Sequence, residues 1–154
     1  MLIRNILEES VRKFDEVKAV KWLNKKEIME RSYGELMENV VSTRKGLLAE
    51  GFEGKHIALI GTSSVEWMES YLGIITGCTT AVPLDAALPC EDLIDLLNRS
   101  DSVALFLSPK LRPYLDAFLE NCPKLQKVWM LQEEVEDAPA KVYGIGELRN
   151  AGKS

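Results

Sequence analysis

The spacing of apolar side chains predicts regular secondary structure along most of the chain. Apolar residues recur every three or four positions over 3–14, which is typical of an amphipathic helix. Two short extended stretches follow at 19–23 and 27–32, and the polar residues Asn-Lys-Lys at 24–26 separate them. A polar turn between two short extended runs favours a β-hairpin.

A second helix is predicted directly after this hairpin. Ser32 and Glu35 have the spacing of a capping box, in which each side chain bonds the other residue's backbone N–H. The apolar stripe continues to about Glu50, and Gly51 is placed to end the helix in a left-handed conformation. Arg44 falls inside that stripe, so we expect its stem to lie along apolar surface with its charged end in water.

From His56 onward, short apolar runs alternate with helical segments. The runs lack polar alternation, which is typical of strands covered on both faces. A second capping box, Ser63 with Glu66, precedes a helix without charges after Glu69, so we expect neighbours on every side of it. Strands are predicted at 56–60, 79–82, 103–107 and 127–131, and helices at 64–76, 90–99 and 109–121. This order predicts an α/β fold with a mostly parallel sheet and helices on both faces, preceded by the N-terminal helix and hairpin.

The pattern changes after residue 131. Residues 132–140 carry four acids and a proline, which indicates a solvated linker, and residues 142–152 predict a strand and one helical turn. We therefore expect an α/β subdomain over 1–131 and an acidic linker with a truncated C-terminal segment over 132–154.

Composition excludes several classes of protein. The net charge is −5 and the acids are spread along the chain, which argues against a nucleic-acid partner. The longest uncharged run, 70–84, is shorter than the roughly 20 residues of a membrane span, and the N-terminus lacks a secretory pattern, so we expect a cytoplasmic protein. Cys78, Cys90 and Cys122 are too far apart for a zinc knuckle or a redox pair, and we expect three reduced, mostly buried thiols.

Five segments are candidates for chemistry, and each has a plain structural alternative. Gly-Thr-Ser-Ser at 61–64 lies between a strand and a helix, where it can form an anion site or simply a turn. His56 is the only histidine and is expected to start a strand. Gly-Lys-Ser at 152–154 lacks the first glycine and the following helix of a phosphate loop. Residues 133–137 favour a charged linker over a metal site, and the glycines at 73 and 77 favour close helix packing. Composition and spacing identify no catalytic, cofactor-binding or metal-binding residue.

Several motifs, taken together, resemble the amino-terminal part of the AMP-forming acyl-CoA synthetases, members of the adenylate-forming ligase superfamily. The resemblance extends over about residues 1–131 in the family's order and with near-constant spacing. The segments that carry it are RSYGEL at 31–36, LLAEGFEGKHIALIG at 47–61, GTSSVEW at 61–67, LGIITGCTTAVPLD at 72–85, and CEDLIDLLNRSDSVALFLS at 90–108.

The resemblance implies an enzyme that activates a carboxylate with Mg-ATP and then transfers the acyl group to a thiol, usually that of coenzyme A. It matches Tyr33, Gly61, Gly77 and Pro83 as scaffold residues and assigns no catalytic role. Lys55 stands where the family usually has Asp, and the gap from Gly77 to Pro83 is one residue longer than in many members, which points to a longer or hydrophobic acid such as a fatty acid.

The resemblance also implies that the family's phosphate loop, metal-binding Glu, ribose-binding Asp and late catalytic Lys follow later in the sequence. We therefore expect a fragment that is inactive by itself, with ATP, Mg²⁺ and coenzyme A bound by the parent ligase. Its expected partners are the remainder of that ligase and, through exposed apolar surface, a second copy of the chain. Two alternatives stay open: a flavodoxin-like binding module with a ligand at the loop after Ile60, and a regulatory or assembly protein built on the ligase scaffold.

Overall fold

The computed structural model describes residues 18–153 except 25–26, 63 and 133. The predicted helix over 3–14 lies outside the described residues. The strands are β1 (Lys18–Asn24), β2 (Glu27–Ser32), β3 (His56–Ile60), β4 (Thr80–Leu84), β5 (Ala104–Leu107), β6 (Lys127–Met130) and β7 (Val142–Gly144). The helices are α2 (Tyr33–Ala49), α3 (Val65–Ile75), α4 (Cys90–Arg99), α5 (Leu115–Asn121) and α6 (Ile145–Lys153), with a 3₁₀ helix η1 (Pro109–Tyr114).

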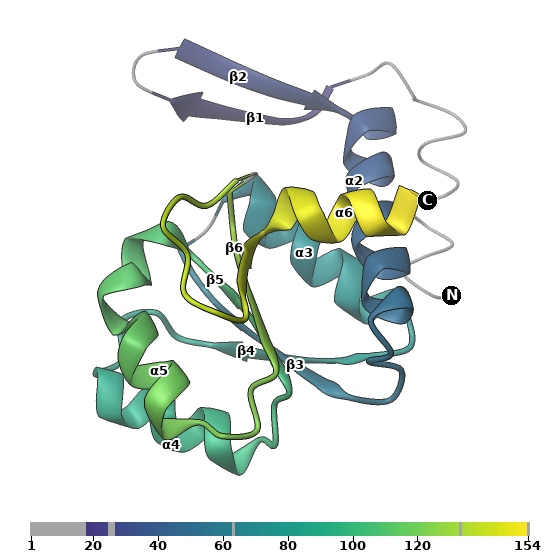
Figure 1. The fold of residues 1–154 in the computed structure, drawn as a ribbon. Helices are drawn as coiled ribbons and strands as arrows, with labels where there is room; N and C mark the ends of the chain where they lie inside the picture. Colours follow the sequence, from purple (N-terminus) through teal and green to yellow (C-terminus); the bar gives the residue numbers. More distant parts are fainter. Residues whose placement is uncertain (1–17, 25–26, 63, 133, 154) are drawn as a thin grey trace.

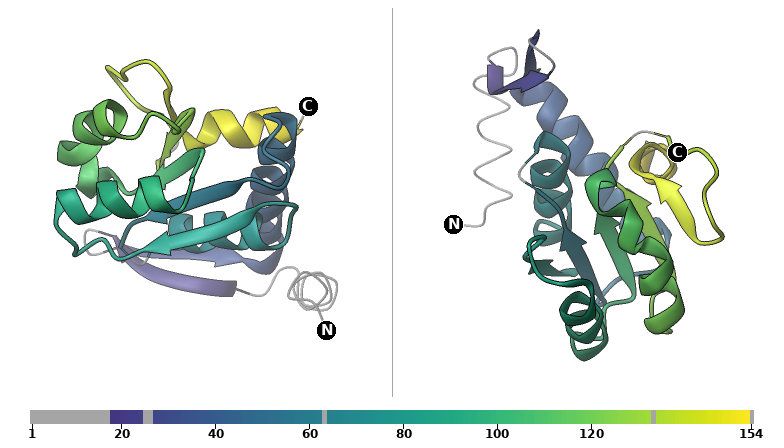
Figure 2. Two further views of the ribbon diagram at one scale, coloured as in Figure 1. Left: turned by 90° about the horizontal axis from the view of Figure 1, so that it is seen from below. Right: turned by 90° about the vertical axis from the view of Figure 1, so that its left-hand side faces the viewer.

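The predicted hairpin and the helix after it are both present. β1 and β2 pair antiparallel as a separate two-stranded sheet, which Figures 1 and 2 show set apart from the main sheet. The Ser32 side chain accepts a bond from the Glu35 N–H at 3.1 Å, and the Glu35 carboxylate accepts from the Ser32 N–H, which confirms the capping box. Gly51, with φ of +82°, takes the left-handed conformation expected after the helix.

The main sheet confirms the predicted parallel α/β architecture. Its five strands have the order β4-β3-β5-β6-β7, and all four pairings are parallel. The chain moves from β3 outward to β4 and then crosses to the other side of β3 to form β5. This is the strand order of flavodoxin-like folds, and its switch point lies between β3 and β5.

Helices cover both faces of the sheet, so the central strands are apolar throughout. Figure 1 shows α4 and α5 on one side and α2 and α3 on the other. Every residue of β5 is buried, and so is every residue of β3 after His56. This burial is expected for strands between two helical layers. The strand residues alternate between two hydrophobic cores, one for each face of the sheet. The first core includes Leu93, Leu97 and Phe118, and the second includes Leu47, Ile74 and Leu148.

The structure corrects four local predictions. β4 begins one residue later and continues to Leu84, and the cap of α3 is Ser64 rather than Ser63, with its hydroxyl accepting from the Trp67 N–H at 3.1 Å. The single helix predicted over 109–121 is split, because Pro113 holds its first half in the 3₁₀ form η1. The predicted single turn near the C-terminus is α6, a helix of nine residues.

α6 packs very closely against α2, and glycines make the approach possible. A Cβ atom added to Gly46 would lie 2.4 Å from the carbonyl oxygen of Leu148, and one added to Gly152 would lie 2.1 Å from that of Ser42. Gly73 on α3 contacts α2 in a similar way, since its Cβ would lie 2.8 Å from the side chain of Thr43. The prediction that Gly73 allows close helix packing is therefore confirmed.

Few large apolar side chains are exposed on the described part of the chain. Leu48 is the large hydrophobic residue exposed there, at 54%, while Met68, Leu72 and Ile75 on the outer side of α3 are half-buried. The three cysteines are free thiols, of which Cys122 is buried, but Cys78 is exposed. No described helix has the length and apolar character needed to cross a membrane.

Candidate functional site

The carboxyl ends of β3 and β5 form the switch point of the sheet, where ligands usually bind in this kind of fold. The turn after β3 begins at Gly61, and Ser108 follows β5 directly. The Ser108 N–H donates to the carbonyl oxygen of Ile60 at 2.9 Å, so the two loops are joined at this point. The structure thus places the predicted turn at 61–64 on the favoured edge of the sheet.

The turn is packed rather than open. A Cβ atom added to Gly61 would lie 3.1 Å from Cβ of Ser108, 3.2 Å from Cδ1 of Trp67 and 3.3 Å from Cδ1 of Leu131. Trp67 in turn stacks on Tyr71 with ring centroids 5.3 Å apart. Ser108 after β5, Leu131 after β6 and Trp67 of α3 therefore pack closely around Gly61, and the hydroxyl of Ser64 already accepts from the Trp67 N–H. The structural alternative for this turn is favoured over an anion site.

The described residues do not fit a metal ion. They contain no group of three or more His, Cys, Asp or Glu side chains placed to hold one. In the acidic segment, the carbonyl oxygens of Glu136 and Asp137 each accept from Nη2 of Arg112 at 3.2 Å. The backbone of this segment is therefore hydrogen-bonded to the 3₁₀ helix η1. Its described carboxylates belong to no group of three or more metal ligands.

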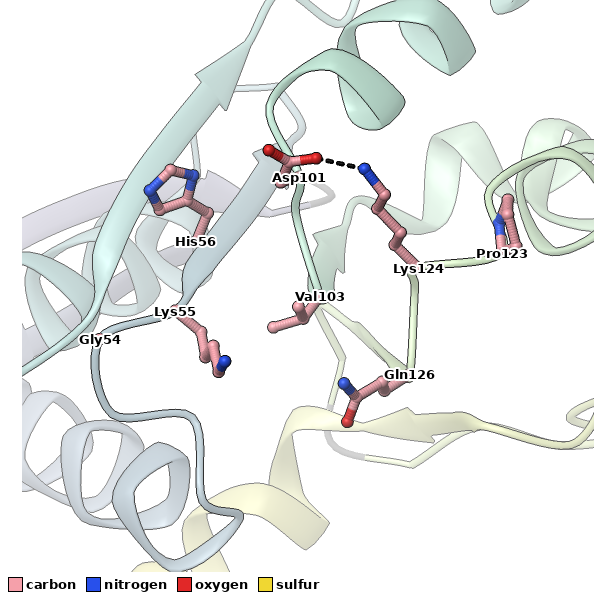
Figure 3. A pocket seen from close by; sticks show the side chains of 8 residues that line it. All are labelled: Gly54, Lys55, His56, Asp101, Val103, Pro123, Lys124 and Gln126. Carbon is pink, nitrogen blue, oxygen red and sulfur yellow. Dashed lines mark hydrogen bonds and ion pairs between the residues drawn. The ribbon is translucent and has the colours of Figure 1, made fainter.

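His56 lies at the opposite, amino-terminal edge of the sheet, beside an open cavity of about 540 Å³. Figure 3 shows this cavity between the starts of β3, β5 and β6. Nδ1 of His56 is 2.7 Å from the carbonyl oxygen of Ser100, and Lys124 forms an ion pair with Asp101 that lowers the pKa of Asp101. The predicted structural role of His56 at the start of a strand agrees with this position, since ligands of parallel sheets bind at the other edge.

The segment at 152–154, which lacks the features of a phosphate loop, has a structural role at its first two residues. Gly152 packs against α2, and Nζ of Lys153 is 3.5 Å from Oε1 of Glu38, an ion pair between α6 and α2. Ser154 lies outside the described residues. Of the scaffold matches, Gly61 and Gly77 are in close contact with neighbouring side chains, and Pro83 lies on the edge strand β4.

A buried ionic cluster is the main feature that the sequence did not predict. Glu69 of α3 is completely buried, and its carboxylate contacts arginines from two other elements. Oε2 of Glu69 is 3.0 Å from Nε of Arg31 and accepts from Nδ2 of Asn39 at 2.8 Å, while Oε1 is 3.5 Å from Nη2 of Arg149. Nε of Arg149 also donates to Oγ1 of Thr43 at 3.1 Å. Side chains of β2, α2, α3 and α6 thus meet at a single carboxylate.

Burial raises the pKa of Glu69, and the charge of Glu66 raises it further, whereas the bond from Asn39 and the charges of Arg149 and Arg31 lower it. Since the folded chain then holds this proton more tightly than the unfolded chain, protonation stabilises the fold. The stabilisation from the protonated Glu69 side chain is complete below its ordinary pKa of 4.5. It is lost as the pH rises through the pKa of Glu69 in the folded chain.

A pH series on the wild type and Glu69→Gln tests this direction. The stability advantage of the wild type over Glu69→Gln should shrink as the pH rises from about 4 to about 8. Urea denaturation at each pH measures the difference in the free energy of unfolding, and other titrating groups cancel in the comparison. If the stability advantage of the wild type over Glu69→Gln grew with pH instead, the arginine charges would lower the pKa of Glu69 by more than burial raises it.

Comparison with known proteins supplies the identity that the site geometry leaves open. The model of the family described as "AMP-binding enzyme" matches residues 7–150, which is nearly the whole chain. The chain belongs to this AMP-binding enzyme family. No curated protein sequence matches it significantly.

Three solved ligases are similar in fold to this member of the AMP-binding enzyme family. The anthranilate CoA ligase AuaEII, solved in complex with anthranoyl-AMP, is 17% identical with a TM-score of 0.81 over 95% of the chain. Coronafacic acid ligase from Pectobacterium brasiliense is 20% identical with a TM-score of 0.86 over 97%. A putative long-chain-fatty-acid CoA ligase from Rhodopseudomonas palustris is 12% identical with a TM-score of 0.80 over 96%. At these identities the likeness shows the fold. The chain spans 27%, 29% and 36% of these three ligase chains.

Proposed function

We propose that the chain forms the amino-terminal α/β part of an AMP-forming acid–thiol ligase. The observation that carries this proposal is the family match over residues 7–150, and the fold shared with two solved CoA ligases supports it. The flavodoxin-like strand order describes topology only, and membership of the AMP-binding family favours the ligase over a separate flavodoxin-like module.

The proposed reaction has two steps. A carboxylate oxygen attacks the α-phosphorus of ATP, the bond to the β-phosphate breaks, and pyrophosphate leaves. The sulfur of a thiol such as coenzyme A then attacks the acyl carbon and loses its proton, and AMP leaves as the C–O bond to its phosphate breaks. The adenylate is needed because a carboxylate oxygen is a poor leaving group and AMP is a good one.

In this proposal the chain is a scaffold and performs neither step by itself. The turn at Gly61 is packed against neighbouring side chains, and the described residues contain no group of three or more His, Cys, Asp or Glu side chains placed to hold a metal ion. We infer that the residues that hold ATP, Mg²⁺ and coenzyme A belong to the remainder of the ligase. The role of the present residues is to fix the sheet and its carboxyl edge, which the Glu69 cluster and the glycine contacts of α6 make rigid.

For the substrate we propose a hydrophobic carboxylic acid, such as a fatty acid, used in the cytoplasm. The extra residue between Gly77 and Pro83 supports this class, because the resemblance associates the longer gap with longer or hydrophobic acids. One of the similar structures is described as a putative long-chain-fatty-acid CoA ligase, which agrees with it.

The test is ATP–pyrophosphate exchange, measured with a panel of aliphatic and aromatic acids. The product of the whole reading frame that contains this sequence should exchange label only when acid, ATP and Mg²⁺ are all present, and fastest with hydrophobic acids. The 154-residue chain should show no exchange with any acid. Exchange by the chain itself would overturn the scaffold role, and a whole product without exchange would overturn the ligase function.

A further inference from the structure

The sides of α2 and α3 that face away from the sheet form one surface, which the ligase proposal does not account for. The two helices are parallel neighbours, because their contacts advance in the same direction along both. Near their starts, Nδ2 of Asn39 donates to Oε2 of Glu69 at 2.8 Å. Near their ends, a Cβ atom added to Gly77 would lie 2.9 Å from Cγ of Arg44. Helix α3 also packs on β3 and β4, so its remaining side is the outer one.

This outer side is apolar over most of its length. We call its half-buried and exposed apolar side chains the outer apolar surface; they are Met37, Val41 and Leu48 of α2 and Met68, Leu72 and Ile75 of α3. It is also hollowed, since a cavity of about 390 Å³ lies beside Met37 and Val41 and one of about 340 Å³ beside Leu48. A connected apolar surface of this kind is typical of a docking site.

The sequence contains a segment with the matching pattern. Residues 3–14 lie outside the described residues, and their spacing predicts an amphipathic helix. The apolar stripe of that helix consists of Ile3, Ile6, Leu7, Val11 and Phe14. A helix of this length has little stability by itself in water and depends on packing its apolar stripe against a partner.

The start of β1 determines which end of this segment lies near which end of α2. Lys18 pairs with Ser32, the residue that caps α2. Only four peptide units join Phe14 to Lys18, a reach of at most about 14 Å, so Phe14 must lie near the start of α2. A helix over residues 3–14 is about 18 Å long. Running antiparallel to α2 from this tether, it would reach the level of Leu48 and span the outer apolar surface.

We propose that residues 3–14 dock on the outer apolar surface as a helix antiparallel to α2 and α3. Ile3 then lies beside the carboxyl-terminal ends of both helices. The contact is apolar and removes Leu48 and Leu72 from water, which is the source of its stability. It also supplies the cover that the uncharged sequence of α3 predicts on that side. The inference does not depend on the ligase function, because it involves only residues of this chain.

The exposed thiol of Cys78 tests this direction, because it lines the cavity at the carboxyl-terminal ends of α2 and α3. Arg4→Cys and Lys13→Cys each add one thiol, near opposite ends of the segment and off its apolar stripe. With a bismaleimide linker, Arg4→Cys should join to Cys78 roughly tenfold faster than Lys13→Cys, because proximity raises the effective concentration. Peptide mass spectrometry identifies the joined cysteines, and Cys90, half-buried on α4 on the other face of the sheet, is the reference acceptor.

Two further variants show whether the outer apolar surface holds the segment. Leu72→Lys places a charge in the middle of this surface and should reduce the Arg4→Cys rate to that of Lys13→Cys. Leu96→Lys makes the same change at a half-buried leucine of α4 and should leave the rate unchanged. Circular dichroism of each variant checks the fold.

Four results would each overturn the proposal. They are equal rates for the two cysteine variants, a faster rate for Lys13→Cys, no link to Cys78 in either variant, and links to Cys90 as frequent as those to Cys78. Links that form only between two chains, seen as dimers on a denaturing gel, would overturn it as well, since a second copy would then occupy the surface.

Discussion

Replacing Glu69 with Ala should lower the free energy of unfolding by about 3–5 kcal/mol, the range expected when one partner of a buried ion pair is removed. The carboxylate is completely buried and lies between Arg31 and Arg149, whose side chains are 21% and 5% exposed. Without it, the two guanidinium groups lose their shared counter-charge, and Asn39 loses the acceptor of its side-chain amide. Urea denaturation followed by circular dichroism measures the change.

Two variants show whether the effect comes from the cluster. Glu66→Ala removes a half-buried carboxylate one turn earlier on the same helix and should change stability by less than about 1 kcal/mol. Glu69→Gln keeps the shape and one acceptor and resembles the protonated form that burial favours, so it should retain more stability than the alanine variant. A Glu69→Ala protein as stable as Glu66→Ala would show that the ionic cluster does not hold the four elements together.

The second large effect is expected at the crossing of α2 and α6. Gly46→Ala places a methyl group 2.4 Å from the carbonyl oxygen of Leu148, and a backbone atom cannot move aside as a side chain can. The helices must separate, and overpacking of this kind destabilises by about 1–3 kcal/mol. This loss is expected although alanine is intrinsically a better helix former than glycine by about 1 kcal/mol.

The control for this prediction is Lys45→Ala, an exposed neighbour on α2, which should leave the free energy of unfolding within about 0.5 kcal/mol of the wild type. Gly152→Ala acts at the same crossing, where its Cβ meets the carbonyl oxygen of Ser42 at 2.1 Å, so the two glycine variants combined should destabilise by less than the sum. A Gly46→Ala protein more stable than the wild type would contradict the close packing of α6 on α2.

The parallel fold could be predicted from sequence because its signals are local. Unbroken apolar strands such as 104–107, the Ser32–Glu35 box and Gly51 each fix their element within a few residues. The short strand near residue 142 was predicted, but the length of the helix after it was not, because α6 is a full helix through its packing on α2, which Gly46 and Gly152 allow. The split of the helix predicted over 109–121 has a local cause, Pro113.

The candidate site also depends on contacts between residues that are distant in the sequence. Glu69 reads as the last charge of an otherwise apolar helix, because its arginine partners lie 38 residues before it and 80 residues after it in the chain. The sequence favours a structural turn at Gly61 but leaves an anion site open, and the choice depends on Ser108 and Leu131, which only the folded sheet brings to it. The spacing of residues along the sequence cannot predict either set of contacts, because the contacting residues are far apart in the chain.

In the proposed function this chain is a scaffold for a larger ligase and does not itself hold nucleotide. Amide ¹⁵N–¹H correlation spectra of the 154-residue chain, recorded during a titration with Mg-ATP, test it most directly. The account predicts that the resonances of Gly61, Thr62 and Ser108, at the carboxyl edge of the sheet, stay in place up to millimolar nucleotide. Saturable shifts of these three amides would contradict it and show that the chain carries a nucleotide site of its own.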